Sequence, residues 1–297
     1  MADVVFILGA GASKRGGAPL MADFLDAARA LLVSESSRQH THASNGPAFN
    51  VAAFNKVFEA IGKLQAIHSK AQLDIFNIES VFATLEMAKL LHKMPGYDTD
   101  HIDGLIDALK IVIASTLELT LKLSLSESGN IPTAPQPYPQ FVKLLQDIRT
   151  ASPPYNPVII TFNYDLALDY ALHQVALPAK YCLDSTDPSS GVPVLKLHGS
   201  LNWVAQGSNV VPWRIGDILN QNPTNIFVYR GTEGPYFQIT PHLINCRNEG
   251  QSPAGSQPVI VPPTWNKYEY QSQITAVWAR AARELSDAKH IFVIGYS

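Results

Sequence analysis

VVFILGAGAS, residues 4–13, joins a short apolar run to a glycine-rich turn. Five consecutive apolar residues, Val4–Leu8, are typical of a strand that is buried on both faces of a parallel sheet. The glycines that follow let the backbone approach a phosphate group closely, and free N–H groups at the start of a following helix would attract its charge. The stretch therefore predicts the first strand and turn of an α/β protein. A tight strand-to-helix turn without any ligand would also explain the glycines.

Five further apolar runs have the same character, being short, rich in β-branched residues and bounded by Gly, Pro or Asn. They are Pro157–Thr161, Val192–Leu197, Asn225–Tyr229, Pro258–Val261 and His290–Ile294. Helices are predicted between several of them, at Pro139–Thr150, Leu166–Val175 and Trp265–Asp287. Strands that alternate with helices indicate a Rossmann-like, doubly wound parallel sheet.

The region between the first two predicted strands has helical spacing instead. Its apolar residues predict helices at Ala22–Leu32, Val51–Ala71, Ile78–Met94 and Ile102–Leu125. We therefore predict one domain over residues 1–297, in which residues 22–130 form a mostly helical insertion. Within it, the polar stretch Glu35–Asn50 predicts a loop, and Ser124–Tyr138 predicts a connection back to the sheet. A doubly wound sheet normally continues into another helix after its last strand, so we expect the chain to come from a longer protein.

Composition argues against several classes of protein. The 297 residues carry 22 Lys and Arg against 25 Asp and Glu, a net charge of -3, so nothing indicates direct nucleic-acid binding. No stretch reaches the roughly 18 apolar residues that a membrane-spanning helix requires. Cys182 and Cys246 stand far apart and predict neither a zinc cluster nor a disulfide framework. We expect a cytoplasmic protein with no metal and no membrane contact.

Polar residues and glycines follow three more of the predicted strands, at the sheet edge where α/β proteins bind ligands. They are Thr161, Asn163, Asp165, His198, Gly199, Ser200, Gly295, Tyr296 and Ser297. Asn163 offers both a donor and an acceptor, while Asp165 could instead cap the following helix. His198 could act as an acid or base near neutral pH, because an unperturbed histidine has a pKa of about 6.5. A structural role is the alternative for each of these residues.

The order of these motifs resembles a known family. GAGAS at 9–13, TFNYD at 161–165, LHGS at 197–200 and GYS at 295–297 resemble the sirtuin set, whose members cleave the nicotinamide–ribose bond of NAD. The stretches Asn77–Phe82, Lys196–Trp203 and Val261–Lys267 are similar to the divergent sirtuin-like proteins of bacterial antiphage defence. The resemblance extends from residue 4 to residue 297. It implies an NAD hydrolase that releases nicotinamide and ADP-ribose and so depletes NAD during antiviral defence.

The resemblance also implies a role for each candidate residue. Asn163 would position the attacking water or the ribose, and His198 would be the general base. The rest of NAD would be bound by Gly9, Ala10, Gly11, Ala12, Ser13, Pro19, Thr161, Asp165, Gly199, Ser200, Gly295, Tyr296 and Ser297. NAD would be the substrate, no metal would be needed, and activation would come from a homo-oligomer or from a partner defence protein.

Two departures bear on the alternatives. The chain has two cysteines, not the four that hold the zinc module of deacylating sirtuins, and Leu20-Met21-Ala22 replaces their usual Asp-Phe-Arg. These changes argue against an NAD-dependent protein deacylase, which is one alternative. A non-catalytic sensor of NAD or ADP-ribose is another. An ordinary dehydrogenase does not fit, because Lys14 occupies the third glycine position of the G-x-G-x-x-G fingerprint.

Overall fold

The computed structural model describes residues 2–39, 50–71, 74–125, 132–183, 191–206, 209–221, 228–231, 234–237, 258–261 and 268–296. Its centre is a five-stranded parallel sheet in the order β12-β1-β4-β6-β5. The strands are β1 (Val4–Leu8), β4 (Pro157–Thr161), β5 (Ala179–Lys180), β6 (Val192–Lys196) and β12 (His290–Ile294). The predicted α/β, Rossmann-like class is confirmed.

β1 lies between two strands that come from distant parts of the chain. Leu8 at its end pairs with Thr161 of β4 on one side and with Ile294 of β12 on the other. Along the chain, the strands after β1 are added on its β4 side, and β12 is then added on the opposite side of β1. The direction in which strands are added to the sheet therefore reverses at β1. In open α/β sheets, ligands bind in the crevice at the carboxyl ends of the strands where this reversal occurs.

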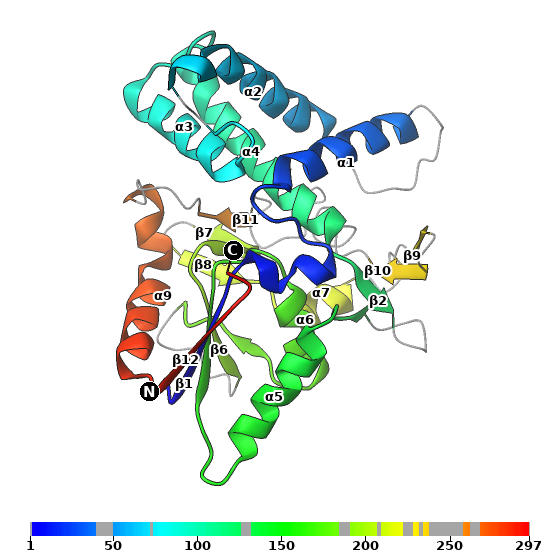
Figure 1. The fold of residues 1–297 in the computed structure, drawn as a ribbon, viewed down its shortest axis with the longest axis vertical. Coiled ribbons are helices and arrows are strands. Elements are labelled where there is room, and N and C mark those ends of the chain that lie inside the picture. The colour runs from blue at the N-terminus through cyan, green and yellow to red at the C-terminus, as the bar shows by residue number, and fades with distance from the viewer. Residues whose placement is uncertain are drawn as a thin grey trace.

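Helices cover both faces of the sheet, with α9 (Tyr268–Asp287) on one side and α5 (Tyr138–Thr150) and α6 (Ala167–Gln174) on the other (Figure 1). Their apolar residues have the spacing that buries one stripe of a helix. In α5 the buried residues are Tyr138, Val142 and Leu145. Pro139 lies in the first turn of α5, as predicted, where its missing N–H costs no hydrogen bond.

The predicted helical insertion forms four helices that pack on one another beyond the carboxyl edge of the sheet (Figure 1). They are α1 (Phe24–Gln39), α2 (Val51–Ala71), α3 (Ile78–Leu91) and α4 (Thr99–Thr120). Several predicted ends were wrong. α3 stops before His92, whose φ of 50° is left-handed and ends the helix. α4 begins at Thr99 and stops at Thr120, and a short strand follows. α1 continues to Gln39, so the first residues of the predicted loop Glu35–Asn50 are helical, and most of the rest lies outside the described residues.

Two predicted strands belong to small antiparallel sheets and not to the central one. One sheet has the order β3-β2-β10-β9 and the other the order β11-β7-β8. Their strands are β2 (Leu123–Leu125), β3 (Pro132–Thr133), β7 (Gly199–Gln206), β8 (Asn209–Pro212), β9 (Val228–Gly231), β10 (Gly234–Phe237) and β11 (Pro258–Ile260). The predictions for 225–229 and 258–261 were therefore wrong about the sheet. β9 pairs antiparallel with β10, and β11 pairs antiparallel with β7. A further short helix, α7 (Ile215–Gln221), was not predicted.

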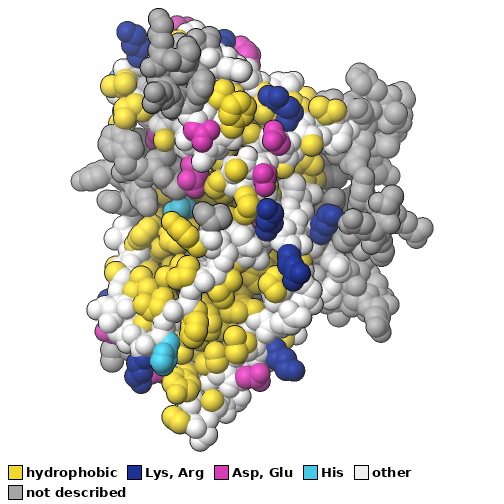
Figure 2. Space-filling view, in the orientation of Figure 1, with side chains coloured by type: hydrophobic (Ala, Val, Ile, Leu, Met, Phe, Trp, Pro, Cys, Tyr) yellow, Lys and Arg dark blue, Asp and Glu magenta, His cyan; other side chains and the backbone are white. Residues whose placement is uncertain are grey.

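β12 is an edge strand whose middle is open to solvent. Ile291, Phe292 and Val293 are 49%, 51% and 58% exposed, and Figure 2 shows hydrophobic side chains gathered over the face where β12 and β1 lie. Phe292 is stacked on Phe6 of β1 at 5.4 Å. In the part of the chain that the structure describes, no helix is both long and apolar enough to cross a membrane.

Candidate functional site

A cavity of about 660 Å³ lies between the carboxyl edge of the parallel sheet and the helical insertion. This volume is in the range of small-molecule binding sites. Eight of the predicted site residues line it together: Gly9, Ala10, Pro19, Asn163, Asp165, His198, Gly295 and Tyr296. They come from the ends of four parallel strands and the loop after β1, so segments at opposite ends of the sequence meet in one site.

The glycine turn brings the ends of β1 and β12 into direct contact. Gly9 N–H donates to the Ile294 carbonyl at 2.9 Å, and Gly11 N–H donates to the Gly295 carbonyl at 2.9 Å. A Cβ atom at Gly9 would lie 2.6 Å from the Gly295 carbonyl oxygen, so a larger residue would push the two segments apart. Gly295 has a φ of 68°, which favours glycine.

The predicted row of free N–H groups after β1 was wrong. The turn continues into two short 3-10 helices, η1 (Ala10–Ala12) and η2 (Lys14–Gly16), and not into an α-helix. Within them Ala12 N–H donates to the Gly9 carbonyl and Ser13 N–H to the Ala10 carbonyl. The turn therefore supplies a close approach for a ligand, while most of its N–H groups already have partners. Gly11, Ala12 and Ser13 lie behind the cavity wall.

Asn163 is held by Gly9 on the cavity wall and by Ser13 and Thr161, which do not line the cavity. Its amide Nδ2 donates to the Gly9 carbonyl at 3.0 Å and to the Ser13 hydroxyl at 3.3 Å, and its backbone N–H donates to Thr161 Oγ1 at 3.1 Å. The Ser13 hydroxyl in turn bonds Tyr138 at 2.7 Å. None of these bonds uses the Asn163 carbonyl oxygen Oδ1, which is the acceptor that Asn163 can offer to a ligand.

Asp165 combines a structural contact with a place on the cavity wall. Its Oδ1 accepts a hydrogen bond from Ala167 N–H at 3.0 Å, but the N-cap position of α6 is Leu166, so the predicted N-cap role of Asp165 was wrong by one residue. The residue is only 5% exposed. Burial raises the pKa of the Asp165 carboxyl group, while the nearby Lys196 charge and the Ser13 hydroxyl act in the opposite direction.

A buried polar network anchors the segments that carry Asp165 and His198. Lys196 Nζ lies 2.8 Å from Asp169 Oδ2, and donates to the Asp165 carbonyl at 2.7 Å and to Ser200 Oγ at 2.9 Å. Ser200 then donates to Asn202 Oδ1 at 2.7 Å. Ser200 is completely buried. Ser200 and Gly199 therefore lie in this network and in β7, behind the cavity.

His198 sits at the turn from β6 into β7, 8% exposed, with aromatic rings on either flank. Its ring centroid is 5.2 Å from that of Phe162 and 6.1 Å from that of Tyr164. The His198 carbonyl accepts from Val261 N–H at 2.8 Å, and the Tyr164 hydroxyl donates to the Val261 carbonyl at 2.9 Å. Val261, which follows β11 and is itself held by Tyr164, thus fixes the histidine backbone at the cavity.

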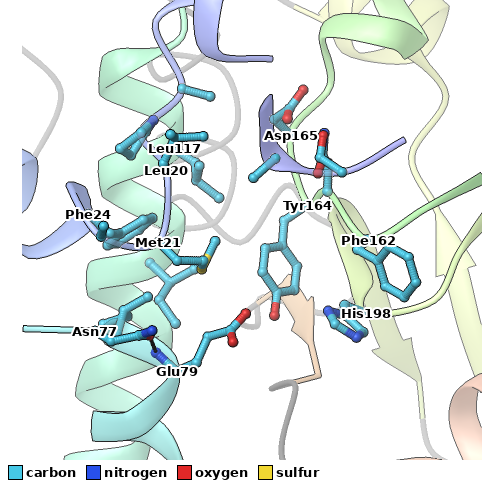
Figure 3. Close-up of a pocket in the computed structure, with 18 of the residues that line it drawn as sticks. Leu20, Met21, Phe24, Asn77, Glu79, Leu117, Phe162, Tyr164, Asp165 and His198 are labelled. Carbon is cyan, nitrogen blue, oxygen red and sulfur yellow. Dashed lines mark hydrogen bonds between the residues drawn. The ribbon is translucent and has the colours of Figure 1, made fainter. Parts of the chain in front are cut away.

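The insertion and the two residues before it contribute a wall that the sequence motifs did not assign to the site. Leu20, Met21 and Phe24 line one side of the cavity, and Glu79 lines it from the first turn of α3 (Figure 3). Phe162 and Tyr164, which belong to the TFNYD motif but were not predicted as site residues, also line it. The only prior signal for Glu79 was its position inside the motif at 77–82, which carried no chemistry by itself.

Two further observations complete the site. Among the described residues, no group of three or more His, Cys, Asp or Glu side chains is arranged to hold a metal ion. Ser297, the last predicted site residue, lies outside the described part of the chain. Neither a protein-family model nor a curated protein matches this chain.

Proposed function

We propose that the protein binds NAD in this cavity and hydrolyses its nicotinamide–ribose bond to give nicotinamide and ADP-ribose. The observation that carries the proposal is the shared cavity of Asn163 and His198, which also has the glycine turn on its wall. Had the two side chains faced separate cavities, they could not act on one carbon atom. The motif resemblance to sirtuin-like NAD hydrolases of antiphage defence supports the same reaction, and a role in NAD depletion is part of the proposal.

The charge of the cavity supports a substrate with a cationic end. Glu79 and Asp165 line it, and no described Lys or Arg does. The nicotinamide ring of NAD carries a positive charge, and the ribose carbon gains positive charge as the ring leaves. Oriented dipoles and carboxylates in a site with little water stabilise such a developing charge. The apolar side chains on the insertion side would limit water around the ring.

The reaction needs one positioned nucleophile. Asn163 Oδ1 accepts a hydrogen bond from the attacking water or from a ribose hydroxyl and so fixes its position. His198 accepts the proton that the water loses as its oxygen bonds to the ribose carbon. The electron pair of the broken carbon–nitrogen bond stays on nicotinamide, which leaves as a neutral molecule, and the proton passes from His198 to solvent.

Nicotinamide release from NAD by the wild type, Asn163→Ala and His198→Ala tests the proposal. Each variant should lose at least about a hundredfold in turnover, the scale of a positioned acid or base. Full activity in both variants would reject the assignment. Acetylated peptide added with NAD separates hydrolysis from deacylation, because only a deacylase would yield acyl-ADP-ribose. Tight NAD binding without cleavage would instead indicate a sensor.

A further inference from the structure

Glu79 presents a carboxylate to the cavity from the helical insertion. It is the second residue of α3, whose start is fixed by the Asn77 side chain accepting from Glu79 N–H at 2.8 Å. In Figure 3 the Glu79 side chain points from α3 across the cavity toward Tyr164 and His198. The Glu79 charge also acts on the Tyr164 phenol, whose pKa is raised chiefly by burial and further by this carboxylate.

Two acidic side chains line the cavity, and they differ in their hydrogen bonds within the described residues. Asp165 is almost fully buried and accepts from the start of α6, whereas none of the hydrogen bonds or ion pairs described for this fold involves the Glu79 carboxylate oxygens. Partial burial alone raises the pKa of Glu79. A carboxylate that has lost water without gaining a partner favours a ligand that supplies hydrogen-bond donors or positive charge.

We infer that Glu79 is a catalytic residue of the NAD-hydrolysing site, supplied by the helical insertion. Its carboxylate accepts hydrogen bonds from the hydroxyls of the nicotinamide ribose and stabilises the positive charge that develops on that ring. The inference rests on the proposed function and extends it, because it makes the insertion a part of the reacting site. Glu79 takes no proton in the reaction, since His198 receives the one from water.

A structural reading of Glu79 makes a different prediction. An acidic residue in the first turn of a helix stabilises the helix by its interaction with the helix dipole, and this would require no ligand. Under that reading, Glu79→Gln would lower the melting temperature and leave the reaction unchanged. Under the catalytic reading, Glu79→Gln keeps the side-chain shape, folds normally and loses activity.

The test compares wild type, Glu79→Gln, Glu79→Asp and Glu59→Gln for nicotinamide release, for binding of NAD and ADP-ribose by calorimetry, and for thermal unfolding. Glu59 is the matched control, because it lies on α2 of the same insertion, is 64% exposed and pairs with Lys63 at 3.0 Å. We expect Glu79→Gln to lose about a hundredfold in kcat, as does removal of one group that stabilises transition-state charge. Glu59→Gln should match wild type. Glu79→Asp keeps the charge on a shorter side chain, farther from the ligand, and its kcat should lie between those of wild type and Glu79→Gln.

The outcomes separate this inference from the proposed function. If wild type hydrolyses NAD and Glu79→Gln does so equally well, the role of Glu79 is refuted and the proposed function stands. If wild type binds NAD without cleaving it, Glu79→Gln should bind NAD at least about tenfold more weakly, the loss of one hydrogen bond to a charged group; equal affinity overturns the inference. If wild type neither binds nor cleaves NAD, both fail. Should Glu79→Gln not fold, Glu79→Asp decides by the same criteria.

Discussion

Replacing Gly9 by alanine tests the contact between the glycine turn and the end of β12. The new Cβ would lie 2.6 Å from the Gly295 carbonyl oxygen and 3.3 Å from the Tyr296 Cα. The first distance is shorter than an ordinary van der Waals contact by roughly 0.9 Å. Both neighbours are backbone atoms, so no side-chain rotation relieves the clash and one of the two segments must move.

The expected cost follows from what this movement disturbs. Overpacking of a close contact costs about 1–3 kcal/mol. The hydrogen bonds from Gly9 and Gly11 to the end of β12 are each worth about 1 kcal/mol and would lengthen. We therefore expect Gly9→Ala to lower the free energy of unfolding by about 2–3 kcal/mol. NAD affinity should fall as well, because Gly9 and Gly295 both line the cavity.

Gly62→Ala is the matched control. Gly62 lies within α2, and an added Cβ there would meet nothing within 4 Å. The same substitution should raise the free energy of unfolding by about 0.8–1 kcal/mol, the difference in helix propensity between the two residues. Urea unfolding and NAD calorimetry measure both variants. Equal stabilities of the two variants, or unchanged NAD affinity in Gly9→Ala, would refute the packing argument.

Three further substitutions test the groups around the site. Tyr164→Phe leaves the Val261 carbonyl without its hydroxyl donor. We expect the free energy of unfolding in urea to fall by about 1–3 kcal/mol, and the rate of nicotinamide release to fall by a larger proportion than the stability. An unchanged kcat would contradict the idea that Tyr164 supports His198. Lys196→Met leaves the buried Asp169 carboxylate without its cationic partner, although the Tyr181 hydroxyl still donates to it, and should cost about 3–5 kcal/mol in the same assay. A loss below about 1 kcal/mol would show the network to be dispensable. Asp165→Asn tests pH dependence: burial raises the pKa of Asp165 above its ordinary 3.8, so wild type loses stability as pH rises from 3.8 through the folded-state value, and Asn does not. The stability of Asp165→Asn relative to wild type should therefore increase over that range and then level off, and a difference independent of pH would oppose this account.

The sequence predicted the central fold where local pattern and tertiary role agree. β1, β4 and β12 have the predicted bounds, since every residue between their bounding turns suits a strand, and α2 also begins and ends as predicted. The pattern could not identify the partners of β9 and β11, because apolar alternation does not record whether a neighbouring strand is parallel. β7 was not predicted as a strand because it carries Ser200 and Asn202, whose polar groups are buried in the Lys196 network.

Part of the candidate site could be predicted because its residues follow the strands of the parallel sheet. Asn163 and His198 follow strands of one parallel sheet, and the ends of such strands share an edge, so the sequence alone predicts that they lie close together. Glu79 and Phe24 could not be assigned to the cavity in this way. Their place depends on how the insertion packs over the sheet, which the helical spacing of α3 and α4 does not specify.

The contact between Gly9 and Gly295 has a consequence for folding during synthesis on the ribosome. β1 is made on the ribosome before β4 and β12, and it has both neighbours only after β12 has been made. Closing such long loops is slow compared with local helix formation. Until β12 and the residues after it emerge, the cavity lacks the wall that Gly295 and Tyr296 form. If NAD is the substrate, a growing polypeptide would be harmless to the cell that is translating it.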